Sequence, residues 1–205
     1  MEKKDYKKEL KELYNPSKKE VSTVIVPKMN YLMIDGKGDP NTAKEYADSI
    51  QALYPVAYTI KFAIKKATGL DFGVMPLEGL WWSDDMSDFI TGKKDNWHWT
   101  SMIMQPDCVT KEIFEKAVVD VKEKKNPASI DKIRFESFDE GKSAQIMHIG
   151  PFADEGPNIK KVHSYILDAG GTFTGKNQKH HEIYLSDMRK TAPEKLKTII
   201  RQSFE

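Results

Sequence analysis

The sequence is poor in cysteine. Cys108 is the single cysteine among 205 residues, so the chain cannot form an intrachain disulfide. This composition is typical of proteins from a reducing compartment, and we expect a cytoplasmic location. Cys108 follows a predicted strand, where a packed or half-exposed thiol is a simpler interpretation than a nucleophile.

The sequence also lacks long apolar runs and an excess of either charge. No stretch approaches the roughly 20 apolar residues that span a bilayer, and residues 1–20 lack the apolar centre of a secretory signal. Lys and Arg number 32 against 31 Asp and Glu, so the net charge is +1. We therefore expect neither nucleic acid nor a membrane as the main partner. A membrane-surface role for residues 1–20 is the alternative.

The motifs of common metal, phosphate and acyl-transfer sites are missing too. The stretch "GKGDP" has Gly36 and Gly38 but lacks the third glycine and the Lys-Ser/Thr pair of phosphate-binding loops. No Gly-x-Ser-x-Gly elbow is present. His180 and His181 are adjacent, and on a strand their side chains diverge and cannot bind one metal ion. We expect neither a metal nor any other cofactor.

What the sequence does contain is one order of elements, repeated. The stretch "GLWWSDD" at 79–85 and the stretch "EIYLSDM" at 182–188 occupy matching places in the order strand, helix, strand, strand. The predicted elements of the first half are a strand at 23–35, a helix at 42–66 interrupted by Pro55, two strands, and an amphipathic helix at 110–125. Those of the second half are two strands joined by a turn at 139–141, a helix ending at 170–171, and the strand "HHEIYLSD".

The final segment is ambiguous by its local signals. Thr191 and Glu194 fit a helix capping box, whereas Thr198, Ile199 and Ile200 are β-branched and favour a strand. The repeat favours a strand near 196–202 after a turn near Pro193, and we adopt that prediction.

Together these patterns predict an α+β fold. Two pseudo-symmetric strand-helix-strand-strand modules, at about 22–125 and 131–205, form an antiparallel sheet with helices. We expect 21–205 to be one domain and 1–20 to be a charged N-terminal segment with a frayed helix.

The strand "HHEIYLSD" places a carboxylate and a phenol on one face. His181 and Ile183 point one way, and Glu182 and Tyr184 point the other. This second face either meets water or lines a pocket that needs one negative charge. In such a pocket, lost hydration is expected to raise the pKa of Glu182. Alignment of the two repeats puts Trp81 opposite Tyr184.

Aromatic residues are the other candidates for a pocket. All four tryptophans lie between Trp81 and Trp99. Trp81 and Trp82 are adjacent on a predicted strand and point to opposite faces, so the four rings cannot all be buried in one compact core. Flat rings suit planar or cationic ligands, although packing in the core is the alternative for each residue. Beside Glu182 and Tyr184 as catalytic residues, the predicted ligand-binding residues are Trp81, Trp82, Trp99, Tyr54, Tyr58 and Met147.

Several separated motifs resemble one known family. "YLMIDGKGDP", "QALYPVAYTIKF", "MPLEGLWW", "QIMHIGPF" and "HHEIYLSD" followed by "TAPEKLKTIIRQ" occur in order and are similar to the GyrI-like small-molecule-binding family, stand-alone branch. The resemblance covers the chain from about Val21 onward. It implies the two-module fold with a central ligand cleft between the helices and the sheet, and a pocket whose acidic group is Glu182. Related transcription factors sense lipophilic cations, and some stand-alone members are hydrolases that open the cyclopropane of DNA-alkylating natural products.

Three functions follow as hypotheses. The first is a hydrolase that adds water to a strained ring without a metal, acting on a planar or lipophilic small molecule. The second is a binding protein that sequesters aromatic or cationic compounds in the same pocket. The third is binding to a protein partner such as a topoisomerase, which the family name suggests. The sequence does not separate the first two, because both need aromatic rings around a carboxylate.

Overall fold

The structure is a computed structural model, and it describes residues 2–205. The strands are β1 (Glu2–Lys4), β2 (Ser22–Val26), β3 (Met29–Lys37), β4 (Leu70–Phe72), β5 (Leu77–Trp82), β6 (His98–Gln105), β7 (Arg134–Phe138), β8 (Gly141–Ile149), β9 (His180–Tyr184) and β10 (Lys197–Ser203). The α-helices are α1 (Tyr6–Glu9), α2 (Lys11–Tyr14), α3 (Lys44–Thr68), α4 (Ser87–Thr91), α5 (Lys111–Lys124) and α6 (Gly156–Asp168). The 3-10 helices are η1 (Lys94–Asn96), η2 (Ile130–Lys132), η3 (Phe152–Asp154) and η4 (Pro193–Lys195).

Eight strands form one antiparallel sheet in the order β2-β8-β10-β9-β5-β6-β3-β7. This order is pseudo-symmetric about the β5–β9 pair, since β3-α3-β5-β6 and β8-α6-β9-β10 repeat one another. The predicted α+β fold with two modules is confirmed. The last strand, β10, follows a 3-10 turn at Pro193–Lys195, as the repeat predicted and against the capping-box signal.

The two modules exchange their first strands, which the sequence did not predict. Pro27 has no N–H group and divides the expected strand at 23–35 into β2 and β3. β2 then pairs with β8 of the second module, and β7 pairs with β3 of the first. The strands on either side of the turn at 139–141 therefore do not pair with each other.

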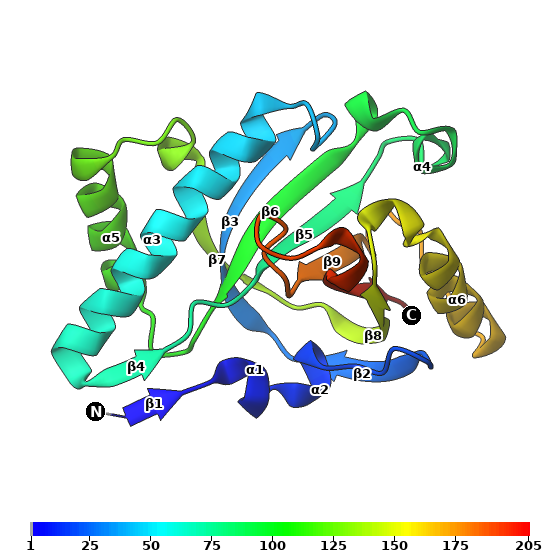
Figure 1. Cartoon of the computed structure of the whole chain (residues 1–205), viewed down its shortest axis with the longest axis horizontal. Helices are drawn as coiled ribbons and strands as arrows, with labels where there is room; N and C mark the ends of the chain where they lie inside the picture. Colours follow the sequence, from blue (N-terminus) through cyan, green and yellow to red (C-terminus); the bar gives the residue numbers. More distant parts are fainter. Residues whose placement is uncertain (1) are drawn as a thin grey trace.

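Helices α3 and α6 pack on the same face of the sheet, which we call the helix face (Figure 1). Ser49 of α3 donates a hydrogen bond to Ser101 of β6, and α6 buries Val162 and Ile166 against Ile200 of β10. The central strands β5 and β9 lie between the two helices, and the orange-red loop after β9 runs in front of them in this view. α3 is continuous through Pro55.

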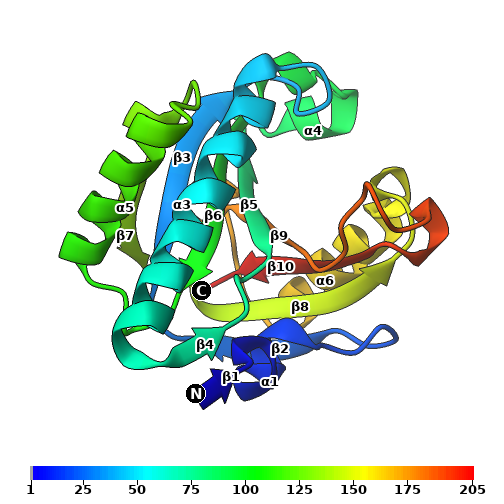
Figure 2. The same cartoon turned by 60° about the vertical axis from the view of Figure 1, so that its left-hand side comes forward.

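The N-terminal segment packs against the rest of the chain, contrary to the expected frayed helix. β1 pairs with β4, and Leu13 and Tyr14 of α2 are buried in the main core. Figures 1 and 2 both show this dark-blue segment beside β2, β4 and β8. Among residues 2–205, no helix is long and apolar enough to cross a membrane.

Candidate functional site

The site is built around the pair formed by Gly79 of β5 and Glu182 of β9. These residues lie directly opposite each other in the ladder that joins the two modules. Glu182 points to the helix face because His181 and Ile183, its neighbours along the strand, are fully buried on the other face. A Cβ atom at Gly79 would lie 2.8 Å from Nε1 of Trp81 and 3.2 Å from the hydroxyl of Tyr184. Glycine therefore leaves the space that the side chains around Glu182 occupy.

Hydrogen bonds hold the Glu182 carboxylate on two sides. Tyr184 donates its hydroxyl to Oε2 at 2.7 Å, and Nε2 of His180 lies 3.0 Å from Oε1. Trp81 in turn donates its Nε1–H to the Tyr184 oxygen at 3.2 Å. These hydrogen bonds, from Trp81 to Tyr184 and from Tyr184 to Glu182, connect the first module to the second and fix the orientation of the carboxylate.

A second carboxyl group, that of Glu155, lies against Glu182. Glu155 precedes α6, is 4% exposed and lies close enough to Glu182 for the charges of the two carboxyl groups to interact. Burial and the negative charge of Glu182 raise the pKa of Glu155 to about 9. Two adjacent carboxyl groups do not both ionise at neutral pH, so Glu155 holds the proton of the pair.

The pKa of Glu182 moves opposite to our expectation. Burial alone would raise it, but the hydrogen bond and charge of His180 and the hydrogen bond from Tyr184 outweigh burial and lower it. The pKa of Tyr184 is raised well above its usual value by burial and by the charge of Glu182, so the phenol keeps its proton. The site therefore presents an ionised Glu182 next to two protonated donors, Glu155 and Tyr184.

Aromatic rings surround these polar groups. Tyr46 of α3 packs on Trp81 and Trp99, with ring centroids 5.6 and 5.1 Å apart. Trp99 is fully buried, and its ring fills the space over Gly36. Phe152, in η3, stands edge-on to Tyr184 at 5.6 Å and is 38% exposed. Ring faces next to a carboxylate suit flat or cationic organic molecules.

Comparison with known proteins identifies the family to which the chain belongs. The sequence profile of the GyrI-like small molecule binding domain matches residues 19–201. The chain belongs to the GyrI-like family. The resemblance that the sequence motifs indicated is thereby confirmed.

Solved structures related to this GyrI-like protein fall into two groups. An uncharacterized conserved protein from Listeria innocua shares 42% identity and a TM-score of 0.90, over 98% of this chain and 99% of that one. A hydrolase from Listeria innocua shares 41% identity and a TM-score of 0.85 over the same fractions. The C-terminal domain of EcmrR shares the fold alone, with 12% identity and a TM-score of 0.55 over 91% of this chain and 97% of that one. No curated protein matches the chain.

The structure brings together only some of the residues that the sequence singled out. Glu182, Tyr184 and Trp81 lie in contact on the helix face of the GyrI-like domain, and Trp99 lies beside Trp81 on the next strand. Trp82 and Met147 occupy the alternate positions of their strands and lie on the opposite face, where Trp82 stacks on His98. Strand alternation keeps both away from Glu182.

Of the three tyrosines of α3, the two that the sequence singled out lie apart from Glu182. Tyr54 and Tyr58 line a surface groove of about 440 Å³ between α3 and α5, together with Phe62 and two lysines of the α5 C-terminus. Tyr58 is 45% exposed. Tyr54 also lies beside Leu77, which pairs with Tyr184 in the ladder of β5 and β9.

Sequence reasoning missed Glu155, Tyr46 and the contact of His180 with Glu182. Glu155 sits in "DEGPN", where an acidic residue before a helix is expected simply as a favourable first-turn charge. Tyr46 occupies one of the apolar positions of its helix, where packing in the core is the expected role. No group of three or more His, Cys, Asp or Glu side chains suited to a metal ion occurs within residues 2–205.

Proposed function

We propose that this GyrI-like protein is a hydrolase that opens the strained cyclopropane of planar, DNA-alkylating natural products by adding water, in the cytoplasm and without a metal. One observation carries the proposal: an ionised carboxylate, Glu182, is held by His180 and Tyr184 beside a protonated Glu155 and the rings of Trp81 and Tyr46. Paired groups with divergent pKa values are typical of acid–base sites. The Listeria innocua hydrolase, 41% identical over nearly the whole chain, supports the reaction class.

Glu182 is the general base in the proposed reaction. Its carboxylate takes a proton from water as the water oxygen forms a bond to a ring carbon of the cyclopropane. The ring carbon–carbon bond breaks, and its electron pair moves through the conjugated system to a carbonyl oxygen. General-base assistance of this kind contributes about 10²–10⁴-fold in rate.

Tyr184 completes the proton balance. Once Glu182 is protonated, it accepts the hydrogen bond from Tyr184 less strongly. The phenol then turns its O–H to the carbonyl oxygen of the substrate, which has gained negative charge. Tyr184 gives its proton to that oxygen and regains one from Glu182. The product is the substrate plus one water, and both residues return to their starting states.

Mass spectrometry after incubation with a cyclopropane-bearing alkylator tests this proposal. A hydrolase converts the compound, over many turnovers, to a product heavier by one water. Recovery of intact compound from a complex with the protein would contradict the hydrolase and leave sequestration.

Binding of lipophilic cations is the second candidate function. The ionised Glu182 among ring faces favours it, because a desolvated cation gains from both a carboxylate and aromatic quadrupoles. If the protein neither converts the alkylator nor binds the alkylator or an aromatic cation, the third hypothesis, binding to a protein partner, is the one that remains.

A further inference from the structure

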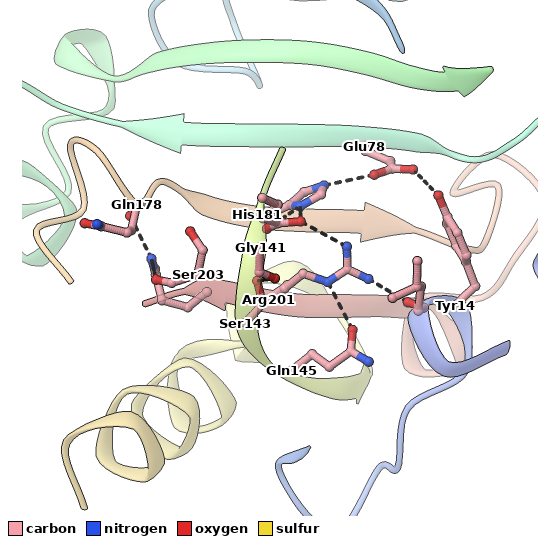
Figure 3. Close-up of polar contacts among 12 residues, drawn as sticks. Tyr14, Glu78, Gly141, Ser143, Gln145, Gln178, His181, Arg201 and Ser203 are labelled. Atoms are coloured by element: carbon pink, nitrogen blue, oxygen red, sulfur yellow. Dashed lines mark hydrogen bonds and ion pairs between the residues drawn. The ribbon is translucent and has the colours of Figure 1, made fainter. Parts of the chain in front are cut away.

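The face of the sheet opposite Glu182 carries a buried network of charged side chains (Figure 3). Nε2 of His181 lies 3.0 Å from Glu78, and its Nδ1 lies 2.9 Å from Glu140. Arg201 donates to Glu140 at 3.2 Å and to Gln145 at 3.0 Å. These residues come from β5, β9, β10, β8 and the turn before β8, so the network spans four adjacent strands and both modules.

The charges of this network balance within it. Burial disfavours a charged imidazole, but the carboxylates of Glu140 and Glu78 on its two nitrogens raise the pKa of His181 to about 9. The same contacts and Arg201 lower the pKa of Glu140 to about 2. The side chains of His181, Glu78, Glu140 and Arg201 are at most 1% exposed, and His181, Glu140 and Arg201 depend on one another to remain charged.

The N-terminal segment closes both ends of the network. Tyr14 donates its hydroxyl to Glu78 at 2.8 Å, and Arg201 donates to the backbone oxygen of Leu13 at 2.6 Å. The Gln145 side chain donates to the backbone oxygen of Glu12, also at 2.6 Å. Residues 12–14 therefore supply one donor and two acceptors that no other part of the network provides.

The network residues are the chain neighbours of the site residues. Glu78 precedes Gly79, and His181 lies between His180 and Glu182. Side chains of successive strand residues leave the same backbone on opposite faces. The Glu78–His181 bond below the sheet and the Trp81–Tyr184 bond above it both join β5 to β9, so each restrains the backbone that the other uses.

We propose that His181 and Tyr14 are positioning residues, and that residues 12–14 brace the β5–β9 pair so that Glu182 stays opposite Gly79 in its productive orientation. The inference rests on the proposed role of Glu182 and assigns a function to the N-terminal segment. Misplacement of a reacting group by about 1 Å costs roughly 10²-fold in rate. Small changes at Tyr14, across the sheet from the chemistry, are therefore expected to be visible in turnover.

The test replaces Tyr14 with phenylalanine and compares it with a matched control. Tyr14→Phe removes the hydroxyl that holds Glu78. Tyr31→Phe also removes a buried hydroxyl near Glu78 and Glu140, but within residues 2–205 that hydroxyl has no hydrogen-bond partner. Both variants are characterised by urea unfolding, by the NMR chemical shifts of the His180 ring at fixed pH, and by turnover per folded molecule.

We expect Tyr14→Phe to change the His180 shifts and to lower kcat by about 10- to 100-fold, with little change in KM. Tyr31→Phe is expected to leave both quantities at the wild-type values. Lower stability of Tyr14→Phe with unchanged shifts and kcat would overturn the proposal, because the network would then be structural only. Equal effects of both variants would overturn it too.

Two further measurements keep the test decisive. Glu78→Gln keeps the side-chain size and an acceptor for Tyr14 but removes the negative charge at His181, and it replaces Tyr14→Phe if that variant fails to fold. The His180 shifts need no substrate. If wild-type protein shows no turnover while the shifts respond to Tyr14→Phe alone, the hydrolase proposal fails and the positioning role stands.

Discussion

The two modules share one backbone arrangement but supply different chemistry. Ser83-Asp84 and Ser186-Asp187 align the repeats, and this pairs Gly79 with Glu182 and Trp81 with Tyr184. The strand partner of Trp81 is Trp99, whereas that of Tyr184 is Thr198. The residue before the main helix is Ala43 in the first module and Glu155 in the second.

The first module thus contributes aromatic rings and, at Gly79, a position without a side chain. The second module contributes the ionisable groups. The pseudo-two-fold axis passes through the Gly79–Glu182 pair, so symmetric residues there would place two carboxylates or two glycines face to face. Two carboxylates would repel each other, and two glycines would carry no charge. Divergence of the repeats at this pair lets one carboxylate occupy the centre of the sheet.

Glu182→Gln removes the group that the first module lacks and gives the largest expected effect. Gln is nearly isosteric but cannot accept a proton from water, so kcat for a cyclopropane substrate is expected to fall by about 10²–10⁴-fold. A neutral substrate should still bind, whereas affinity for an aromatic cation should fall. Steady-state kinetics and titration calorimetry measure the two effects.

An exposed strand glutamate provides the control for this variant. Glu136→Gln lies on β7, away from the site, and is expected to keep the wild-type rate. Wild-type turnover by Glu182→Gln would mean that Glu182 is not the base. The difference between the modules would then need another explanation.

Gly79→Ala adds a methyl group at the empty position of the first module. The new Cβ would lie 2.8 Å from Trp81 and 3.2 Å from Tyr184, so both side chains must move and the Trp81–Tyr184 hydrogen bond is expected to break. Overpacking of this kind costs about 1–3 kcal/mol of stability, and we expect kcat to fall by roughly tenfold or more.

Gly73→Ala is the matched control for Gly79→Ala. A Cβ at Gly73 would meet no atom within 4 Å, and this glycine does not adopt a positive φ. Urea unfolding and kinetics of both variants separate crowding at the site from the general effect of adding a methyl group. Equal behaviour of the two variants would show that the space at Gly79 has no role in holding Tyr184.

Trp81→Ala removes the ring that the first module places against Tyr184. If a planar ligand covers this ring, we expect binding to weaken by about 2 kcal/mol, or roughly thirtyfold in Kd. Trp82→Ala, on the other face, is the comparison and should change Kd little. Tryptophan fluorescence titrations measure both. Unchanged affinity of a folded Trp81→Ala would remove Trp81 from the site.

Local patterns predicted the elements, and contacts distant in the chain decided the rest. Strand alternation placed Glu182, Tyr184 and Trp81 on one face, and the repeat predicted β10 correctly. Alternation equally placed Trp82 on the other face, although aromatic composition suggested the pocket. The strand exchange was not visible, because pairing partners depend on tertiary packing rather than on local propensity.

The missed residues act through long-range contacts. Tyr14 bonds Glu78 across 64 positions, and only the folded sheet brings Glu155 to Glu182. The expected rise in the pKa of Glu182 was wrong for the same reason. Desolvation was predictable from the aromatic neighbours, but the opposing hydrogen bonds of His180 and Tyr184 and the proton on Glu155 depend on side-chain geometry.

The smallest expected effect concerns Glu155, whose counterpart in the first module is the uncharged Ala43. Folded protein holds the Glu155 proton up to a pKa of about 9, whereas an unfolded glutamate loses it near 4.5. His181 likewise holds a proton up to about 9 against 6.5 when unfolded. Between pH 7 and 9 the folded state therefore binds more protons, and the free energy of unfolding must fall as pH rises.

Glu155→Gln removes one of these two protons and should make that decline shallower. Each proton contributes a slope of at most about 1.4 kcal/mol per pH unit, so the variant should lose stability about half as steeply as wild type near pH 7–8. Urea unfolding at pH 7, 8 and 9 measures the slopes, with the exposed Glu194→Gln as the control that keeps the wild-type slope. An unchanged slope in Glu155→Gln would mean that Glu155 is ionised in the folded protein. The residue before the main helix would then carry no proton in either module. Only His180 and Tyr184 would keep Glu182 ionised.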